Sequence, residues 1–208
     1  GNSEKISTVS RVEKPKNSPT PTVATSGADA NDTFKVTIAT PELCPRFTAS
    51  VVRNVTIKPS PFWMQRRLIM AGMRPINNIV DAYNAVAIRH GVSIGVHTYH
   101  RRDDIYVMRS EAPRAFRPLF AKKEITIPAG DIVYTCGDVP LASIGKVDAD
   151  AHDFRLTKDS SRLLVVILGH DDTSFQFNQA VIEELVDTLR QKMPNLSHHF
   201  LETVRDHA

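Results

Sequence analysis

The chain has 208 residues, of which 41% are hydrophobic and 24% are charged, and its formal net charge is +3. These values are ordinary for a globular protein, and the length fits one substantial domain or one domain with a small appendage. The mild positive charge permits contact with nucleic acid but does not predict it. No apolar run is long enough for a transmembrane helix, and no signal peptide is recognisable, so we expect a cytoplasmic protein without a membrane partner.

Residues 1–33 are rich in Ser, Thr, Pro, Lys and Ala. Such a segment buries too little apolar surface to offset the entropy of ordering it, which predicts a linker or disordered segment. The leading Gly1, without an initiator Met, suggests a piece of a longer chain. Residues 34–208 are therefore expected to form the folded domain.

The first half of this domain predicts two strands and then two helices. Alternation predicts a strand at 34–39, and β-branched residues predict another at 48–57. Ser60 is a predicted N-cap with Pro61 at the first helical position, and Gly72 ends this helix. A second helix is predicted from Asn78 to His90, with Gly91 as its stop.

The second half predicts mainly short strands, followed by helices. The strands are expected at 105–110, 124–128, 131–135, 140–145 and 153–157. Residues 162–169 are continuously apolar, which indicates a central strand buried on both faces. Thr173 is a predicted cap of a helix that Pro194 ends, and a last amphipathic helix is predicted over 195–206. Segregated helices and strands indicate the α+β class.

Residues 44–84 hold the most informative motifs. They include CPRFTASVV, then PSPFWMQRRL, then GMRPINNIVD. The stretch resembles the opening of the editing module in the β-subunit of bacterial phenylalanyl-tRNA synthetase, the B-three/B-four domain. The resemblance implies a layered β-sandwich with flanking helices, of the PheT/TilS-like kind. It is strong to residue 91 and weaker to about residue 193, where the chain is closer to free-standing relatives of the module.

The resemblance implies an editing activity rather than the ligase reaction. The module would bind the tRNA 3′ end and its amino acid, and would hydrolyse mischarged Tyr-tRNA(Phe), because a site that binds the tyrosine hydroxyl can select the error. The implied partners are tRNA, the synthetase α-subunit and other β-chain domains, with no DNA and no cofactor. The alternative is a non-catalytic RNA-binding or structural interaction module.

The resemblance also assigns candidate site residues. Arg74, in the R-P-I motif, matches an editing-pocket residue, although it could instead fix the turn between two helices. Gly95 stands where the family has a pocket histidine. His97 lies two positions on, so a strand would place it on the same side as Gly95, but histidines in such positions often serve the surface or core. Asn78 is a candidate for binding substrate or for capping the second helix.

The loop after the predicted strand 140–145 completes the candidate site. Backbone N–H groups near Gly145 are expected to polarise an ester, and Ala142 is expected to contact substrate. The family carries a glutamate on the strand after this loop, whereas residues 162–169 contain no acid. No metal is expected: Cys44 and Cys136 form no Cys-x-x-Cys pair and are predicted to be buried free thiols. The acidic cluster at 148–153 is more typical of a solvated loop.

Overall fold

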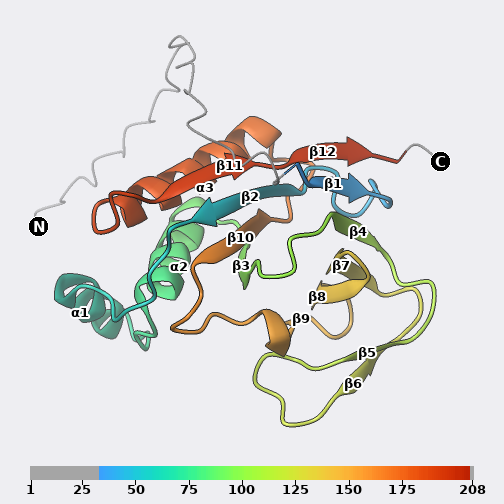
Figure 1. The fold of residues 1–208 in the computed structure, drawn as a ribbon, viewed down its shortest axis with the longest axis horizontal. Helices are drawn as coiled ribbons and strands as arrows, with labels where there is room; N and C mark the ends of the chain where they lie inside the picture. Colours follow the sequence, from blue (N-terminus) through green and yellow to red (C-terminus); the bar gives the residue numbers. More distant parts are fainter. Residues whose placement is uncertain (1–32, 207–208) are drawn as a thin grey trace, which may run out of the picture.

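The computed structural model describes residues 33–206, and Figure 1 shows their arrangement. The predicted linker therefore lies, except for its last residue, outside the described part of the chain. Two large sheets, a two-stranded ribbon and three α-helices build the described part of the fold. The six-stranded sheet has the order β12 (Glu202–Arg205), β1 (Lys35–Ile38), β4 (Ile105–Arg109), β7 (Ile132–Cys136), β8 (Val139–Ser143) and β9 (Ala149–Asp150).

The second sheet has four strands. Its order is β11 (Ser197–Phe200), β2 (Thr48–Arg53), β10 (Arg162–Ile167) and β3 (Ile94–Thr98). The remaining elements are a small ribbon, a short 3₁₀ helix and the helices: β5 (Arg114–Phe116), β6 (Ile125–Ile127), η1 (His152–Phe154), α1 (Phe62–Met70), α2 (Asn78–His90) and α3 (Phe175–Arg190). Within the described residues, no helix is long and apolar enough to cross a membrane.

Strand β10 shows how the layers stack. Its side chains alternate, so Leu164 and Val166 enter the core between the two sheets, whereas Leu163 and Val165 enter the core beneath the helices. All four are buried. The order of layers is therefore six-stranded sheet, four-stranded sheet, then α2 and α3 (Figure 1). The predicted central strand and the predicted layered β-sandwich with flanking helices are both confirmed.

The polar residues of the GMRPINNIVD motif join α1 to α2. Asn77 is the N-cap of α2, because its side chain accepts hydrogen bonds from the backbone N–H groups of Ile79 and Val80. Asp81 is buried, accepts a hydrogen bond from the Ser60 hydroxyl, and accepts another from the backbone of the loop that precedes α2. The motif therefore fixes the angle at which α1 leaves the domain.

Two predicted elements were wrong. Residues 153–157 do not form a strand but continue from η1 as irregular chain, because Phe154 turns into the core and is 1% exposed. Residues 195–206 do not form a helix. They form β11 and β12, which pair with the open sides of β2 and β1. A segment whose polar pattern suits a helix pairs instead with two strand edges that only the tertiary fold supplies.

Two predicted helix caps were also wrong. Ser60 does not cap α1, since Pro61 holds that position and the Ser60 hydroxyl bonds to Asp81. Ser174, rather than Thr173, caps α3 by accepting from the backbone N–H of Phe177. Both corrections move the helix start by one position.

The two cysteines are free and buried, as predicted. Burial raises the pKa of the Cys44 thiol to about 11. The pKa of Cys136 is also raised to about 11, chiefly by burial. Neither thiol is therefore a reactive thiolate near neutral pH.

Candidate functional site

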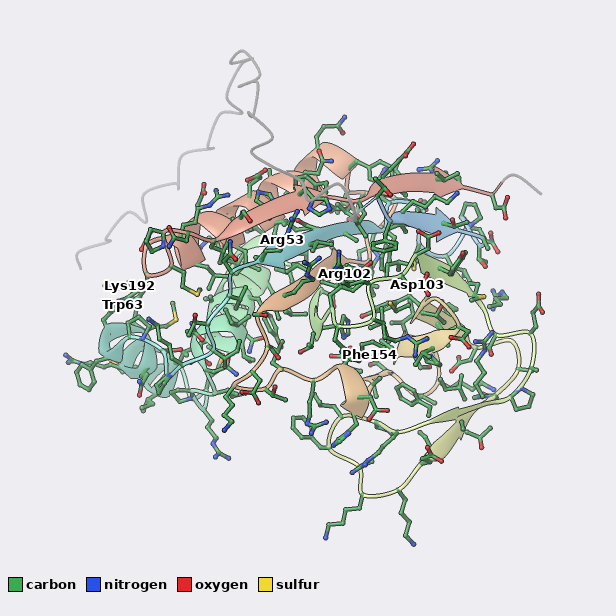
Figure 2. All side chains as sticks on the ribbon, in the orientation of Figure 1. Arg53, Trp63, Arg102, Asp103, Phe154 and Lys192 are labelled. Carbon is green, nitrogen blue, oxygen red and sulfur yellow. The ribbon has the colours of Figure 1, made fainter. Side chains whose placement is uncertain are left out.

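A cavity of about 460 Å³ lies where the two sheets end. Strand β3 is the last strand of one sheet and β9 the last strand of the other, and both border the cavity. Helix α2 contributes Tyr83, β3 contributes Val96 and His97, and β9 contributes Asp150. Phe154, labelled in Figure 2, adds an apolar wall from the segment that follows β9. The cavity thus joins apolar surface to a small group of polar side chains, as ligand sites commonly do.

His97 and Tyr134 form a buried pair beside this cavity. The Nε2 atom of His97 lies 2.6 Å from the Tyr134 hydroxyl, and His97 is 1% exposed. Burial lowers the pKa of His97 to about 4, so the imidazole is neutral at neutral pH. Burial, followed by the negative charge of Asp150, raises the pKa of Tyr134 well above its ordinary value. The pair therefore offers neutral hydrogen-bonding groups.

Asp150 supplies the carboxylate of the cavity. Its Oδ1 atom lies 4.0 Å from Nε2 of His97, and its side chain is 43% exposed. Burial raises the pKa of Asp150, and the nearby charge of Asp148 adds to the shift. The pKa of Tyr83 is raised as well, chiefly by burial and secondly by the charge of Asp150. An accessible carboxylate among apolar walls can accept a hydrogen bond from a ligand hydroxyl or bind a ligand ammonium group.

Gly95 lies against the His97–Tyr134 pair. A Cβ atom at this position would be 2.9 Å from Cγ2 of Val166, 3.0 Å from the Tyr134 hydroxyl and 3.3 Å from Nε2 of His97. The space for a side chain at position 95 is thus already filled. Gly95 and His97 face the same side of β3, as alternation predicts.

Ala142 and Gly145 have different surroundings. Ala142 on β8 pairs with Tyr134 and with Asp150 on the flanking strands, so its backbone lies within the layer that carries both residues. Gly145 instead adjoins Asp131: a Cβ atom there would overlap Oδ1 of Asp131. Gly145 is outside the set of residues that line the cavity.

Asp131 organises the loop around Gly145. Its carboxylate accepts hydrogen bonds from the backbone N–H of Lys146, at 2.8 Å, and from the Ser143 hydroxyl, at 3.1 Å. Burial by itself would raise the pKa of Asp131, but these hydrogen bonds hold it below the ordinary value. At least one backbone N–H group near Gly145 is therefore already bound to a carboxylate.

Arg74 and Asn78 lie away from the His97–Tyr134 pair. Arg74 is exposed in the loop between α1 and α2, and Ile76 and Asn77 of the same loop border the cavity. Asn78 is buried, accepts a hydrogen bond from the backbone N–H of Lys58 and donates one to the backbone of residue 56. Both ends of its amide are used in holding the chain before α1.

Sequence reasoning missed the role of Tyr134 and placed Asp150 only in an acidic loop. The signal in the sequence that bears on Tyr134 is the alternation within 131–135. It places Tyr134 on the same strand face as Ile132. The pairing of β9 with β8, which turns Asp150 toward the cavity, depends on contacts between strands. The structure thus brings together Gly95, His97, Tyr134 and Asp150, with Ala142 on the adjoining strand.

Three comparisons place the chain among known proteins. The family model of the B3/4 domain matches residues 43–183. The phenylalanine–tRNA ligase beta subunit of Staphylococcus aureus (strain bovine RF122 / ET3-1) is 33% identical over 175 residues, which cover 76% of this chain and 22% of that protein. The beta subunit of Staphylococcus saprophyticus is 39% identical over 122 residues, which cover 58% of this chain and 15% of that protein.

A solved structure shows the same fold. It is an N-terminal fragment of the phenylalanyl-tRNA synthetase beta-subunit from Pyrococcus horikoshii, with a TM-score of 0.60 and 13% identity, covering 83% of this chain and 52% of that one. The chain spans only about a fifth of the length of the staphylococcal subunits it matches. On the family match and the shared fold, the chain belongs to the B3/4 domain family found in the beta subunit of phenylalanine–tRNA ligases.

Proposed function

We propose that this domain is an editing-type aminoacyl-tRNA deacylase, whose cavity binds the aminoacyl end of mischarged Tyr-tRNA(Phe) and hydrolyses the ester. The observation that carries the proposal is the cavity of about 460 Å³ that His97 and Asp150 both line, with Tyr134 hydrogen-bonded to His97 beside it. A cytoplasmic protein that works beside the α-subunit and the other β-chain domains fits the same proposal.

Asp150 takes the role of the glutamate that the family carries on the strand matching β10, which has no acid in this chain. The apolar walls, among them Val96 and Phe154, accept the aromatic ring, and the Asp150 carboxylate accepts the tyrosine hydroxyl. Phenylalanine would leave this carboxylate without that hydrogen bond. A site built around a hydroxyl selects against the analogue that lacks one, because its polar group then stays unpaired.

Hydrolysis itself needs a positioned water molecule. The water oxygen attacks the ester carbonyl carbon, the bond to the ribose oxygen breaks, and the proton that the water gives up passes to the ribose oxygen. His97 is neutral at neutral pH, so its contribution is to orient the water or the amino acid rather than to carry a charge. Arg74, exposed on the loop that borders the cavity, binds a phosphate of the tRNA end.

The test measures release of amino acid from tyrosyl- and phenylalanyl-tRNA of the phenylalanine acceptor by the purified chain. We expect selective release of tyrosine, a loss of that selectivity in Asp150→Asn, and a lower rate in Arg74→Ala. Asp159→Asn, which makes the same change at an exposed site in another part of the molecule, is the matched control. Equal release of both amino acids would contradict the role of Asp150.

A binding module without hydrolysis is the second candidate. It is favoured by the low pKa of His97 and by the Lys146 N–H that Asp131 already binds. In that case the chain would bind tyrosyl-tRNA saturably, with Asp150→Asn weakening the binding, yet would release no amino acid above the buffer rate. Repeating the assay in a complete synthetase complex separates this outcome from a chain that needs other subunits to deliver the tRNA.

A further inference from the structure

Helix α1 exposes most of its apolar side chains. Of its nine residues only Met64 and Leu68 are buried. Four large apolar side chains are exposed: Phe62 at 80%, Met70 at 77%, Ile69 at 63% and Trp63 at 51%. Helices this short depend on packing for stability, and clustered apolar side chains on a protein surface mark interaction sites. Figure 1 shows α1 at the end of the molecule, beyond α2.

A hollow of about 320 Å³ adjoins this helix. It lies between the segment before α1, the start of α2 and the end of α3, and Pro61, Met64 and Met193 give it an apolar floor. Trp63 forms one side, and Lys192 lies at its rim close to Trp63 (Figure 2). Such a hollow is of a size to receive an apolar side chain from another molecule.

The charge around the hollow and the helix has one sign. Lys58 and Lys192 lie at the hollow, and Arg66 and Arg67 lie on α1. All four are exposed, and the described part of the chain gives none of them an ion pair. The sequence of α1, FWMQRRLIM, holds no acid. The surface therefore lacks the negative charge that would complement it.

The composition of this surface favours a protein over a nucleic acid. Aromatic residues, Met and Arg are enriched in protein interfaces, and Trp and Arg supply many of the strongest contacts. Ile69 and Met70 have no ring on which a base could stack, although they are among the most exposed side chains. A second copy of the chain would bring the same positive charges together, so an acidic partner fits better.

We propose that α1 and the adjoining hollow form a docking surface for an acidic amphipathic helix of another protein segment. An apolar side chain of that helix enters the hollow beside Trp63, its neighbours cover Phe62 and Met70, and its carboxylates pair with Arg66 and Arg67. This site is separate from the cavity at His97. The docking proposal therefore does not depend on the deacylase proposal.

The test uses synthetic peptides and the full chain. The first peptide is an amphipathic helix of Leu, Phe and Glu, and the second carries Lys in place of every Glu. An oligouridylate RNA is the nucleic-acid comparison. Anisotropy of a labelled probe measures binding, and Trp63 emission locates it, because Trp63 is the only tryptophan of the chain. We expect only the acidic peptide to bind saturably and to shift the Trp63 emission. Added salt should weaken this binding.

Variants decide whether the surface is responsible. Arg66→Glu with Arg67→Glu should weaken binding of the acidic peptide on the order of tenfold or more. Lys122→Glu with Lys123→Glu, an equal charge change at exposed positions between β5 and β6, should leave it unchanged. Phe62→Ala should weaken binding of the acidic peptide, and His97→Gln should not.

Four outcomes would overturn the proposal. They are equal binding of the acidic and basic peptides, binding of the RNA alone, self-association that covers Trp63, and no binding of the acidic peptide.

Discussion

The backbone at Gly95 carries no side chain because neighbouring groups already fill the space beside it. Val166, on the paired strand β10, approaches from one side, and the Tyr134 hydroxyl with the His97 ring closes the other. A side chain at position 95 could therefore be accommodated only if the His97–Tyr134 pair or Val166 moved. The imidazole of this site comes from His97, two positions along the same strand face.

Gly95→Ala should destabilise the protein by disturbing this pair. The added methyl group would meet Val166 at 2.9 Å and the Tyr134 hydroxyl at 3.0 Å, so either the β10 side chain or the Tyr134–His97 hydrogen bond must move. Overpacking of this kind typically costs about 1–3 kcal/mol. Urea denaturation measures the change in the free energy of unfolding.

Ser93→Ala is the control for that measurement, since Ser93 is exposed just before the same strand. It should change the free energy of unfolding by no more than about 0.5 kcal/mol. Equal stability of Gly95→Ala and the parent chain would show that the pair shifts at no cost, and that position 95 does not require glycine.

The residue scale also shows what the sequence could predict about the site. Alternation along a strand was enough to place Gly95 and His97 on one face. It did not identify Tyr134 or Asp150 as their neighbours, because those contacts cross from one sheet to the other and depend on strand order. Polar partners brought together by tertiary packing leave no fixed spacing in the sequence.

At the scale of elements, the joint between α1 and α2 depends on one carboxylate. Asp81, in the first turn of α2, is 1% exposed, and it bonds both to Ser60 before α1 and to the backbone N–H of Ile76. Within α1 itself, only Met64 and Leu68 are buried. The position of the proposed docking surface is thus controlled from α2.

Asp81→Ala should release α1 more than it unfolds the domain. The buried hydrogen bond from Ser60 and the part-buried one from the backbone N–H of Ile76 are both lost. The buried Ser60 hydroxyl left unpaired costs about 1–3 kcal/mol. We expect faster amide hydrogen exchange across residues 62–70, with little change in β10. Asp187→Ala on α3 is the matched control, since the Asp187 side chain is 69% exposed and pairs with Arg190 on the same helix. Uniformly faster exchange over the whole domain would contradict a local joint.

Elements were predicted well where their signals are local and poorly where they are not. Helix α2 has the predicted bounds because Asn77 and Gly91 mark its ends within the chain itself, with Gly91 at a φ of 64°. Residues 195–206 gave a helical pattern, yet 197–200 and 202–205 extend the two sheets. Strand pairing across more than a hundred residues outweighs local propensity there.

At the scale of the whole molecule, the site lies where the sandwich opens. Both sheets end beside the cavity, at β3 and β9, so the His97–Tyr134 pair has buried strands on one side and the cavity on the other. The same layering buries His97 completely enough to suppress its charge. Folding of the whole domain is therefore coupled to the protonation state of this one side chain.

Stability should fall as the pH drops from about 6.5 to about 4 because of His97. Burial lowers its pKa from 6.5 to about 4 in the folded protein, whereas the unfolded chain takes up the proton near the ordinary value. The stabilising effect of the neutral ring is thus complete above pH 6.5 and is lost progressively as the pH approaches 4, by roughly 3 kcal/mol in total. His97→Gln should flatten this part of the pH dependence of the free energy of unfolding, measured by urea denaturation, while His170→Gln at an exposed site should not. Parallel curves for His97→Gln and the parent chain across this window would mean that His97 takes up a proton equally well in the folded and unfolded states, as only an imidazole in contact with water can.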